Sequence, residues 1–364
     1  MRIAFDYQIF SLQAYGGISR YYVRLADALA IAGNDVGIFA PLHCNEYMSQ
    51  LPAGVVNGRK VDGGLSKLLR FSHPINRLAA SLSLRKYKPD LLHETYFSSD
   101  GMGGHNLPVV LTVYDMVHEL FPSEFSRFGA ARHKRRAIQR ADHIICISEN
   151  TRQDLIYFFD VDPQKVSVVY LGVDPAKAYG SGQVSTGQKP YILFVGQRAG
   201  YKNFHCLVRA FSMSERLKAD YNLVCFGGGV FTSAEQGTLY DLGISAGVVH
   251  VGGSDSDLAS VYANASAFVY PSKYEGFGLP PLEAMAYGCP VVVSHSSSMP
   301  EVVGDAGEYF TPDCPEHLLA SLEGVLFDDE RRSSLIACGK ERLKRFTWQG
   351  CAADTLSVYE KVRG

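Results

Sequence analysis

The sequence predicts an α/β protein built from two doubly wound domains of similar size, each with a parallel sheet. Short apolar runs alternate with amphipathic stretches along the chain, as expected for parallel strands joined by right-handed helical crossovers. The alternation restarts after residue 189, and 364 residues are more than one typical core contains. With 46% hydrophobic residues, the chain can bury both cores.

In chain order, the apolar runs of the first half predict strands at residues 2–6, 35–40, 90–93, 109–113, 143–147 and 166–170. Those of the second half predict strands at 191–195, 222–226, 248–251, 267–270, 290–294 and 308–310. The turn-rich segment 176–189 is the predicted linker, so we expect one domain at 1–175 and another at 190–346. The chain beyond residue 328 is predicted to be helical throughout.

Composition narrows the class of protein. A formal net charge of -2 argues against nucleic acid as a main partner, so small molecules are the expected ligands. The eight cysteines lack metal-ligand spacing and predict reduced thiols in the cytoplasm, with no metal site. No apolar run reaches the roughly 18 to 20 residues of a membrane span, and the amino terminus starts as a strand rather than a signal peptide. We therefore expect a soluble protein, at most peripheral on a membrane.

The most informative segment is 270–293, YPSKYEGFGLPPLEAMAYGCPVVV, which has a glutamate on either side of a glycine-rich turn. Pro280 and Pro281 favour a helix start directly after this turn, where missing N–H groups cost least. The remaining amides and the positive helix end suit an anion such as a diphosphate. Glu275 and Glu283 suit a neutral polyhydroxylic group beside it, as in a sugar nucleotide. Taken singly, Glu283 also fits a first-turn glutamate that complements the helix dipole, and Glu275 a solvated loop residue.

Residues that directly follow strands are the other candidates, because ligands of open α/β sheets bind beyond the carboxyl ends of strands. In the loop 196–203, GQRAGYKN, Arg198 and Lys202 are placed to neutralise a leaving diphosphate, with exposed helix-start cations as the alternative. Asp115 and His118 follow strand 109–113 and are expected on the acceptor or sugar side, with a packed core histidine as the alternative for His118.

Three further features follow strands or turns. His93 and Glu94, which follow residues 90–92, are expected to face the ligand cleft. Gly17, in the loop GGISR after the first strand, is expected near the donor phosphate or in a tight turn, and the absence of G-x-G-x-x-G there counts against a nicotinamide dehydrogenase. The D-x-D tripeptides at 160–162 and 255–257 are interpreted as a turn and a helix start.

Segment 270–293 resembles the signature of the retaining family 4 glycosyltransferases, whose GT-B members carry two glutamates separated by seven residues around a G-F-G-x-P turn. Glu275 and Glu283 keep that separation. The resemblance covers nearly the whole chain and is strongest over 191–312. It implies a GT-B fold, with two Rossmann-like domains facing a cleft and a C-terminal helix, 347–364, that crosses back to the first domain.

The resemblance also implies residue roles. Glu275 would meet a hydroxyl of the donor sugar with the amides of Phe277 and Gly278, and Glu283 would bind the ribose hydroxyls. Family members often have the diphosphate-binding arginine one position before Arg198, so Lys202 matches more closely. They also often have a histidine where Tyr114 stands. The predicted catalytic residues are Glu275, Lys202, Arg198, Asp115 and His118, and those of the donor site are Gly17, Arg198, Lys202, Val251, Glu275, Gly276, Phe277, Gly278, Leu279 and Glu283.

The implied reaction is transfer of a hexose, with mannose favoured, to a hydroxyl of a saccharide or lipid-linked acceptor, without a cofactor. The segments GGISRYY and VGQRAGYKNF resemble bacterial mannosyltransferases that assemble surface polysaccharides such as lipopolysaccharide, which favours GDP-mannose over a UDP-sugar as donor. A GT-B sugar-nucleotide epimerase or hydrolase, acting without an acceptor, is the alternative. The basic stretch 132–140 is either a solvated helix face or a contact with anionic lipid at the cytoplasmic face of the inner membrane.

Overall fold

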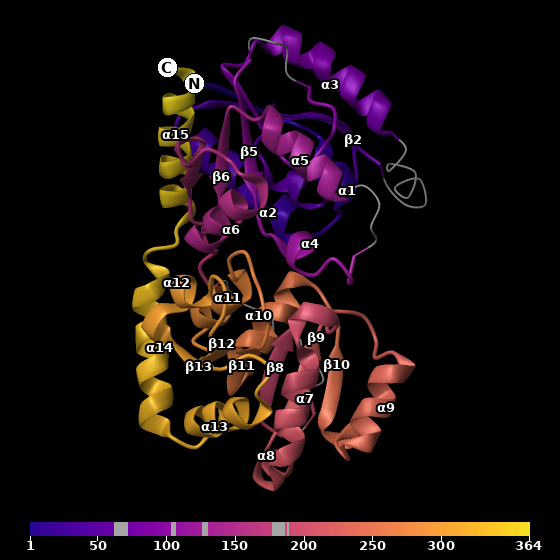
Figure 1. Cartoon of the computed structure of the whole chain (residues 1–364), viewed down its shortest axis with the longest axis vertical. Coiled ribbons are helices and arrows are strands. Elements are labelled where there is room, and N and C mark those ends of the chain that lie inside the picture. Colours follow the sequence, from indigo (N-terminus) through magenta and orange to yellow (C-terminus); the bar gives the residue numbers. More distant parts are fainter. Residues whose placement is uncertain (62–71, 103–106, 126–129, 177–185, 188) are drawn as a thin grey trace. The chain divides into compact units, whose positions relative to one another are not determined.

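The computed structural model describes residues 1–61, 72–102, 107–125, 130–176, 186–187 and 189–364, and it forms two compact units (Figure 1). Unit 1 comprises Met1–Gly172 and Trp348–Gly364, and unit 2 comprises Val173–Thr347. Most of the predicted linker 176–189 lies outside the described residues, so its extent stays a prediction.

Unit 1 contains a parallel sheet with the strand order β3-β2-β1-β4-β5-β6-β7. The chain adds strands first on one side of β1 and then on the other, as in doubly wound folds. Its strands are β1 (Arg2–Phe5), β2 (Asp35–His43), β3 (Val56–Lys60), β4 (Leu91–Glu94), β5 (Val109–Val113), β6 (His143–Cys146) and β7 (Val166–Val168). Its helices and 3-10 turns are α1 (Gln8–Leu12), α2 (Gly17–Ile31), η1 (Tyr47–Gln50), α3 (His73–Tyr87), α4 (Val117–Leu120), α5 (Ala130–Arg140), α6 (Glu149–Phe159), η3 (Pro163–Lys165) and α15 (Trp348–Arg363).

Unit 2 contains a second parallel sheet with the order β10-β9-β8-β11-β12-β13. Its strands are β8 (Tyr191–Val195), β9 (Asn222–Phe226), β10 (Val248–Val251), β11 (Ala267–Tyr270), β12 (Val291–Ser294) and β13 (Gly307–Phe310). Its helices and 3-10 turns are η4 (Gly200–Lys202), α7 (Phe204–Met213), α8 (Glu215–Asp220), α9 (Ser233–Asp241), η5 (Ser245–Gly247), α10 (Asp255–Asn264), α11 (Leu279–Ala286), α12 (Met299–Val303), η6 (Gly304–Ala306), α13 (Pro315–Leu326) and α14 (Asp329–Leu343).

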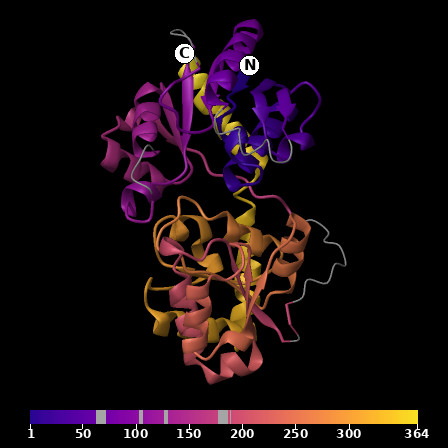
Figure 2. The same ribbon diagram turned by 90° about the vertical axis from the view of Figure 1, so that its right-hand side faces the viewer.

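Every strand predicted from an apolar run is confirmed, and so is the doubly wound α/β class. Interior strands read as continuous apolar runs because helices cover both faces of each sheet, as Figures 1 and 2 show for unit 2. Side chains of α7, α9 and α13 share one buried cluster with strand residues such as Ile192, Val269 and Val292. The edge strand β3 was missed because most of its side chains are exposed and polar.

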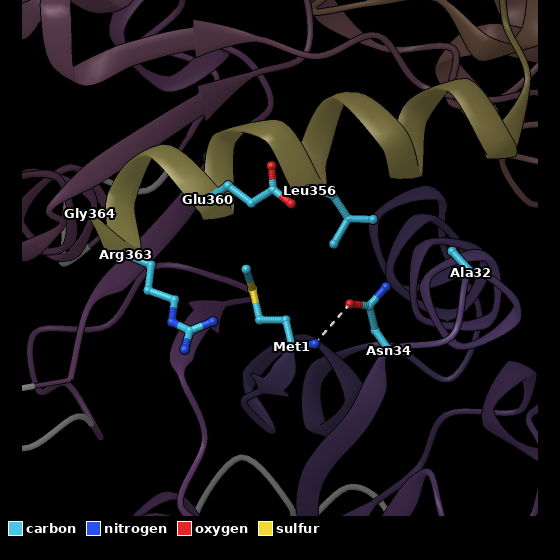
Figure 3. A pocket seen from close by; sticks show the side chains of 7 residues that line it. All are labelled: Met1, Ala32, Asn34, Leu356, Glu360, Arg363 and Gly364. Carbon is cyan, nitrogen blue, oxygen red and sulfur yellow. Dashed lines mark hydrogen bonds between the residues drawn. The ribbon is translucent and has the colours of Figure 1, made fainter.

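The C-terminal helix α15 belongs to unit 1, as the sequence predicted for a helix that returns to the first domain. The hydroxyl of Tyr359 lies 2.6 Å from Nδ1 of His93, and the Trp348 ring lies against Tyr21. Near its end, α15 lines a pocket of about 620 Å³ with Met1 and Asn34 (Figure 3). This pocket lies at the amino end of β1, opposite the edge where ligands of such sheets bind.

Among the described helices, none is both long and apolar enough to cross a membrane.

Candidate active site

In unit 2, the loop between β11 and α11 brings a strand end and a helix start close together. Gly278 precedes α11 in a left-handed conformation, with φ 112°. A Cβ on Gly278 would lie 2.4 Å from the terminal Cε of Met299, which would have to move, and the left-handed backbone conformation would strain any larger residue at this position. The prolines of the first turn follow directly, as predicted. The glycine therefore fixes the turn that carries Glu275 next to the start of α11.

A serine-rich loop after β12 holds the backbone on both sides of Glu275. Ser297 Oγ accepts a hydrogen bond from the Glu275 amide at 2.9 Å. Ser298 Oγ donates to the carbonyls of Glu275 and Phe277 at 2.9 and 2.8 Å. Neither serine was among the predicted site residues. The only signal for them was the serine cluster that directly follows strand 290–294.

Lys202 and Glu275 form an ion pair, with Nζ 2.6 Å from Oε1 and side chains that are 19% and 13% exposed. Lys202 Nζ also lies 3.5 Å from the hydroxyl of Tyr270. Burial alone would lower the pKa of Lys202, but the negative charge of Glu275 and the nearby hydroxyls of Tyr270 and Tyr201 outweigh it and hold this pKa above its ordinary value. The ammonium is therefore charged at neutral pH. With three N–H donors, it can hold Glu275 and a bound anion together.

Glu283 lies on α11 and accepts a hydrogen bond from the hydroxyl of Tyr262, with Oε2 at 3.3 Å. Burial raises the pKa of Tyr262 well above its ordinary value, so the phenol stays a donor. The helix begins at Leu279 rather than at the prolines, and its first turn contains no acidic residue. The interpretation of Glu283 as a first-turn glutamate that complements the helix dipole is therefore wrong.

Arg198 follows β8, but its side chain points to the loop after β9. Its guanidinium donates to the carbonyls of Gly227, Gly229 and Val230 at 2.8 to 3.1 Å. Nε donates to Glu235 at 2.7 Å, and the whole residue is only 7% exposed. The glycines at 227–229 all adopt left-handed conformations, which turn their carbonyls toward the guanidinium. Arg198 thus shapes this loop, and its contact with a diphosphate stays a prediction.

We expect Arg198→Met to lower the free energy of unfolding by about 2–3 kcal/mol, because several carbonyls and the Glu235 carboxylate lose a charged donor. Urea unfolding measures this, with Arg209→Met on the exposed face of α7 as the control. An unfolding midpoint equal to that of the control would show that the guanidinium does not hold the loop.

In unit 1, the acceptor-side candidates are placed by short local contacts. Asp115 Oδ1 accepts a hydrogen bond from the amide of Val117 at 3.1 Å and so starts α4. His118 lies on α4 against Phe125, with ring centroids 4.4 Å apart, and it is partly exposed rather than packed in the core. Gly17 is the first residue of α2, with open space around a Cβ at this position. These three residues belong to unit 1, whereas the Lys202–Glu275 pair belongs to unit 2.

His93 and Glu94 are both 0% exposed, so the prediction that they face the ligand is wrong. His93 bonds Tyr359 and Thr112 through its two ring nitrogens, and burial lowers its pKa to about 3. Glu94 pairs with Arg140 at 2.6 Å, and its pKa is about 7 because burial outweighs this pairing. The two residues hold the interior of unit 1 together, where α5 and α15 reach β4.

The remaining predictions concern backbone and turns. The Val251 carbonyl, at the end of β10, accepts a hydrogen bond from the Gly227 amide at 2.9 Å. The D-x-D tripeptides are structural, as interpreted: Asp162 accepts from the Gln164 amide before β7, and Asp257 forms a capping box with Ser254. Within the described ranges, His, Cys, Asp and Glu side chains nowhere gather in a group that could hold a metal ion.

The fold and the site define a class of protein, the GT-B enzymes with two Rossmann-like units. The family model "Glycosyltransferase Family 4" matches residues 15–177, and "Glycosyl transferases group 1" matches residues 181–342. The chain belongs to the family 4 glycosyltransferases.

Curated relatives are similar in sequence to this chain over most of its length. The O-antigen chain mannosyltransferase B of Escherichia coli is 28% identical, with 94% of this chain and 96% of the relative aligned. The MMP alpha-(1->4)-mannosyltransferase of Mycolicibacterium hassiacum is 29% identical over 79% of this chain and 74% of its own. Among solved structures, a sucrose-phosphate synthase from Thermosynechococcus elongatus superposes with a TM-score of 0.78 over 99% of this chain and 98% of its own, at 21% identity. The last comparison shows the fold alone.

Proposed function

We propose that this glycosyltransferase moves a hexose, with mannose favoured, from a nucleotide diphosphate sugar to a hydroxyl of a saccharide or lipid-linked acceptor, with retention of the anomeric configuration. The observation that carries the proposal is the Lys202–Glu275 pair. It sits beyond the carboxyl ends of β8 and β11, which are neighbours in the sheet. A charged ammonium beside a carboxylate suits a diphosphate bonded to a sugar.

Each side chain has a role in this reaction. Lys202 stabilises the charge that develops on the diphosphate as its bond to the anomeric carbon breaks. Glu275 orients a hydroxyl of the donor sugar, and Glu283, held by Tyr262, orients the ribose hydroxyls. The acceptor hydroxyl attacks the anomeric carbon on the leaving-group face, and its proton passes to a phosphate oxygen of the departing nucleoside diphosphate. The protein then contributes positioning and charge stabilisation rather than a covalent nucleophile.

GDP-mannose is the proposed donor, with a UDP-sugar as the rival. Both curated relatives described above are named mannosyltransferases, which supports mannose as the sugar. In this proposal the Lys202 ammonium supplies the positive charge that a metal ion supplies in other sugar-nucleotide enzymes, so no cofactor takes part. The eight cysteines, all within the described residues, are unpaired, which supports a cytoplasmic site of action.

A thermal-shift screen against GDP, UDP and ADP sugars tests the donor. A nucleotide present at about 100 times its Kd should raise Tm by about 5 °C, because it binds the native state only. We expect the largest shift with GDP-mannose. A larger shift with a UDP-sugar would reject the proposed donor but keep the reaction.

A separate measurement of product tests the reaction class. Product formed at an equal rate without any acceptor would identify a sugar-nucleotide hydrolase or epimerase.

A further inference from the structure

Two basic side chains of α5 form ion pairs within unit 1. The Lys134 side chain is 2% exposed, and its Nζ lies 2.7 Å from Oε2 of Glu119. Arg140 pairs with the buried Glu94. Of the lysines and arginines in the stretch 132–140, only Arg132, Arg135 and Arg136 remain exposed. A membrane contact through α5 would therefore rest on fewer charges than the sequence indicates.

Helix α3 presents large apolar side chains to solvent in a regular row. Ile75, Leu78 and Leu82 are 63%, 66% and 52% exposed. Their spacing of three and four residues places them on one face of the helix. Single exposed apolar residues are ordinary, but a contiguous row on an outer helix of the unit marks a contact surface (Figure 1). We call these three residues the α3 stripe.

The opposite face of α3 is fixed to the sheet, so the stripe cannot turn inward. Asn76 is buried, with its Oδ1 accepting from the Leu42 amide at 2.8 Å and its Nδ2 donating to the Leu42 carbonyl at 2.9 Å. Ala80 and Leu84 follow Asn76 at four-residue intervals and are also buried. The helix thus packs on β2 by one face and leaves the α3 stripe on the other.

The charge around the stripe indicates what covers it. Arg85 and Lys86, three and four residues beyond Leu82, continue the same face and are exposed. The sequence of α3, HPINRLAASLSLRKY, contains no acidic residue. A helix with an exposed apolar stripe, flanking cations and no acid suits the boundary of an anionic bilayer, where apolar side chains enter the acyl region and cations meet lipid phosphates.

We propose that α3 docks unit 1 onto an anionic lipid bilayer through the α3 stripe, with Arg85 and Lys86 at the lipid phosphates. The inference rests on the proposed function in one respect: docking on a bilayer would bring the enzyme to a lipid-linked acceptor, which is held there. Binding to lipid itself needs neither donor nor acceptor.

Cosedimentation of the full chain with lipid vesicles tests the proposal. The probes are vesicles of phosphatidylglycerol mixed with phosphatidylcholine, and vesicles of phosphatidylcholine alone. The stripe variant is Leu78→Glu with Leu82→Glu, and the charge variant is Arg85→Ser with Lys86→Ser. Ile31→Glu with Tyr157→Glu is the matched control, because these residues are 76% and 83% exposed elsewhere on unit 1.

We expect the unsubstituted chain and the control to bind the anionic vesicles more strongly than the neutral ones. The stripe variant should bind at least about tenfold more weakly. Each cation removed should weaken binding about fivefold. Binding of the stripe variant equal to that of the control would overturn the proposal, as would no vesicle binding by the unsubstituted chain.

Two further readouts separate other occupants of this face. A dimer that is seen by sedimentation and lost in the stripe variant, without vesicle binding, would assign the face to a second copy of the chain and overturn the proposal. Loss of binding on reversing the charges of Arg132, Arg135 and Arg136, with no loss in the stripe variant, would assign the membrane contact to α5 instead. Because no donor is present, failure in these assays leaves the proposed transferase reaction standing.

Discussion

Glu275→Gln is expected to lower kcat by about 10²–10³ while leaving the affinity for the nucleoside diphosphate nearly unchanged. The amide keeps the size of the side chain but loses the charge that, in the proposed reaction, orients the sugar hydroxyl. Lys202, freed from its 2.6 Å ion pair, remains available to the diphosphate, so nucleotide binding is retained. Interactions that strengthen only as the transition state forms act on kcat rather than on ground-state binding.

Steady-state kinetics with calorimetric titration of the nucleoside diphosphate separates these effects. Glu330→Gln, an exposed glutamate on α14, is the matched control and should leave both quantities unchanged. Turnover by the Glu275→Gln enzyme at the unsubstituted rate would remove this residue from the reaction. A parallel loss of nucleotide affinity would indicate that it acts through the shape of the loop rather than on the sugar.

Lys202→Met should weaken donor binding by about 10- to 100-fold and lower kcat by about 10²-fold or more. The loss is expected in both quantities because, in the proposed reaction, the ammonium contacts the diphosphate in the ground state and contacts it more strongly as the sugar bond breaks. The substitution also leaves the mostly buried Glu275 carboxylate without its ion pair, so some loss of stability should accompany it.

A charge-balanced variant separates binding from folding. Lys202→Met combined with Glu275→Gln removes both charges, so stability should recover relative to Lys202→Met alone while donor affinity stays low. Lys340→Met on the exposed part of α14 is the control for loss of a lysine. Donor affinity that recovers along with stability in the double variant would show that Lys202 acts on the fold and not on the diphosphate.

The fold could be predicted from the sequence wherever burial alone decides the residue type. Strands such as β12, buried throughout, read as unbroken apolar runs, and their bounds were correct within a residue or two. The edge strand β3 carries most of its side chains in solvent, so it has no such signal. The start of α11 lies at Leu279, one residue before its prolines, because the left-handed Gly278 directly precedes the helix.

Glu275 and Glu283 could be proposed as site residues because their spacing lies within one segment, and their roles stay predictions. Contacts made by distant segments were not predictable. Ser298 meets Glu275 from a separate loop. In the sequence, His93 has the position of a histidine at the ligand-binding edge of the sheet. In the structure, its Nδ1 is hydrogen-bonded to Tyr359, which lies 266 residues later in the chain. Arg198 likewise turns away to the loop after β9, and only the tertiary structure reveals its partners.

The measurement that tests the diphosphate site most directly is a calorimetric titration of a nucleoside diphosphate and the matching monophosphate into two proteins. These are the unsubstituted chain and Lys202→Met, with the base chosen as the one that gives the largest thermal shift. The unsubstituted chain should prefer the diphosphate by about tenfold or more, and Lys202→Met should lose most of that preference. An undiminished preference for the diphosphate in Lys202→Met would contradict the placement of the diphosphate at this lysine.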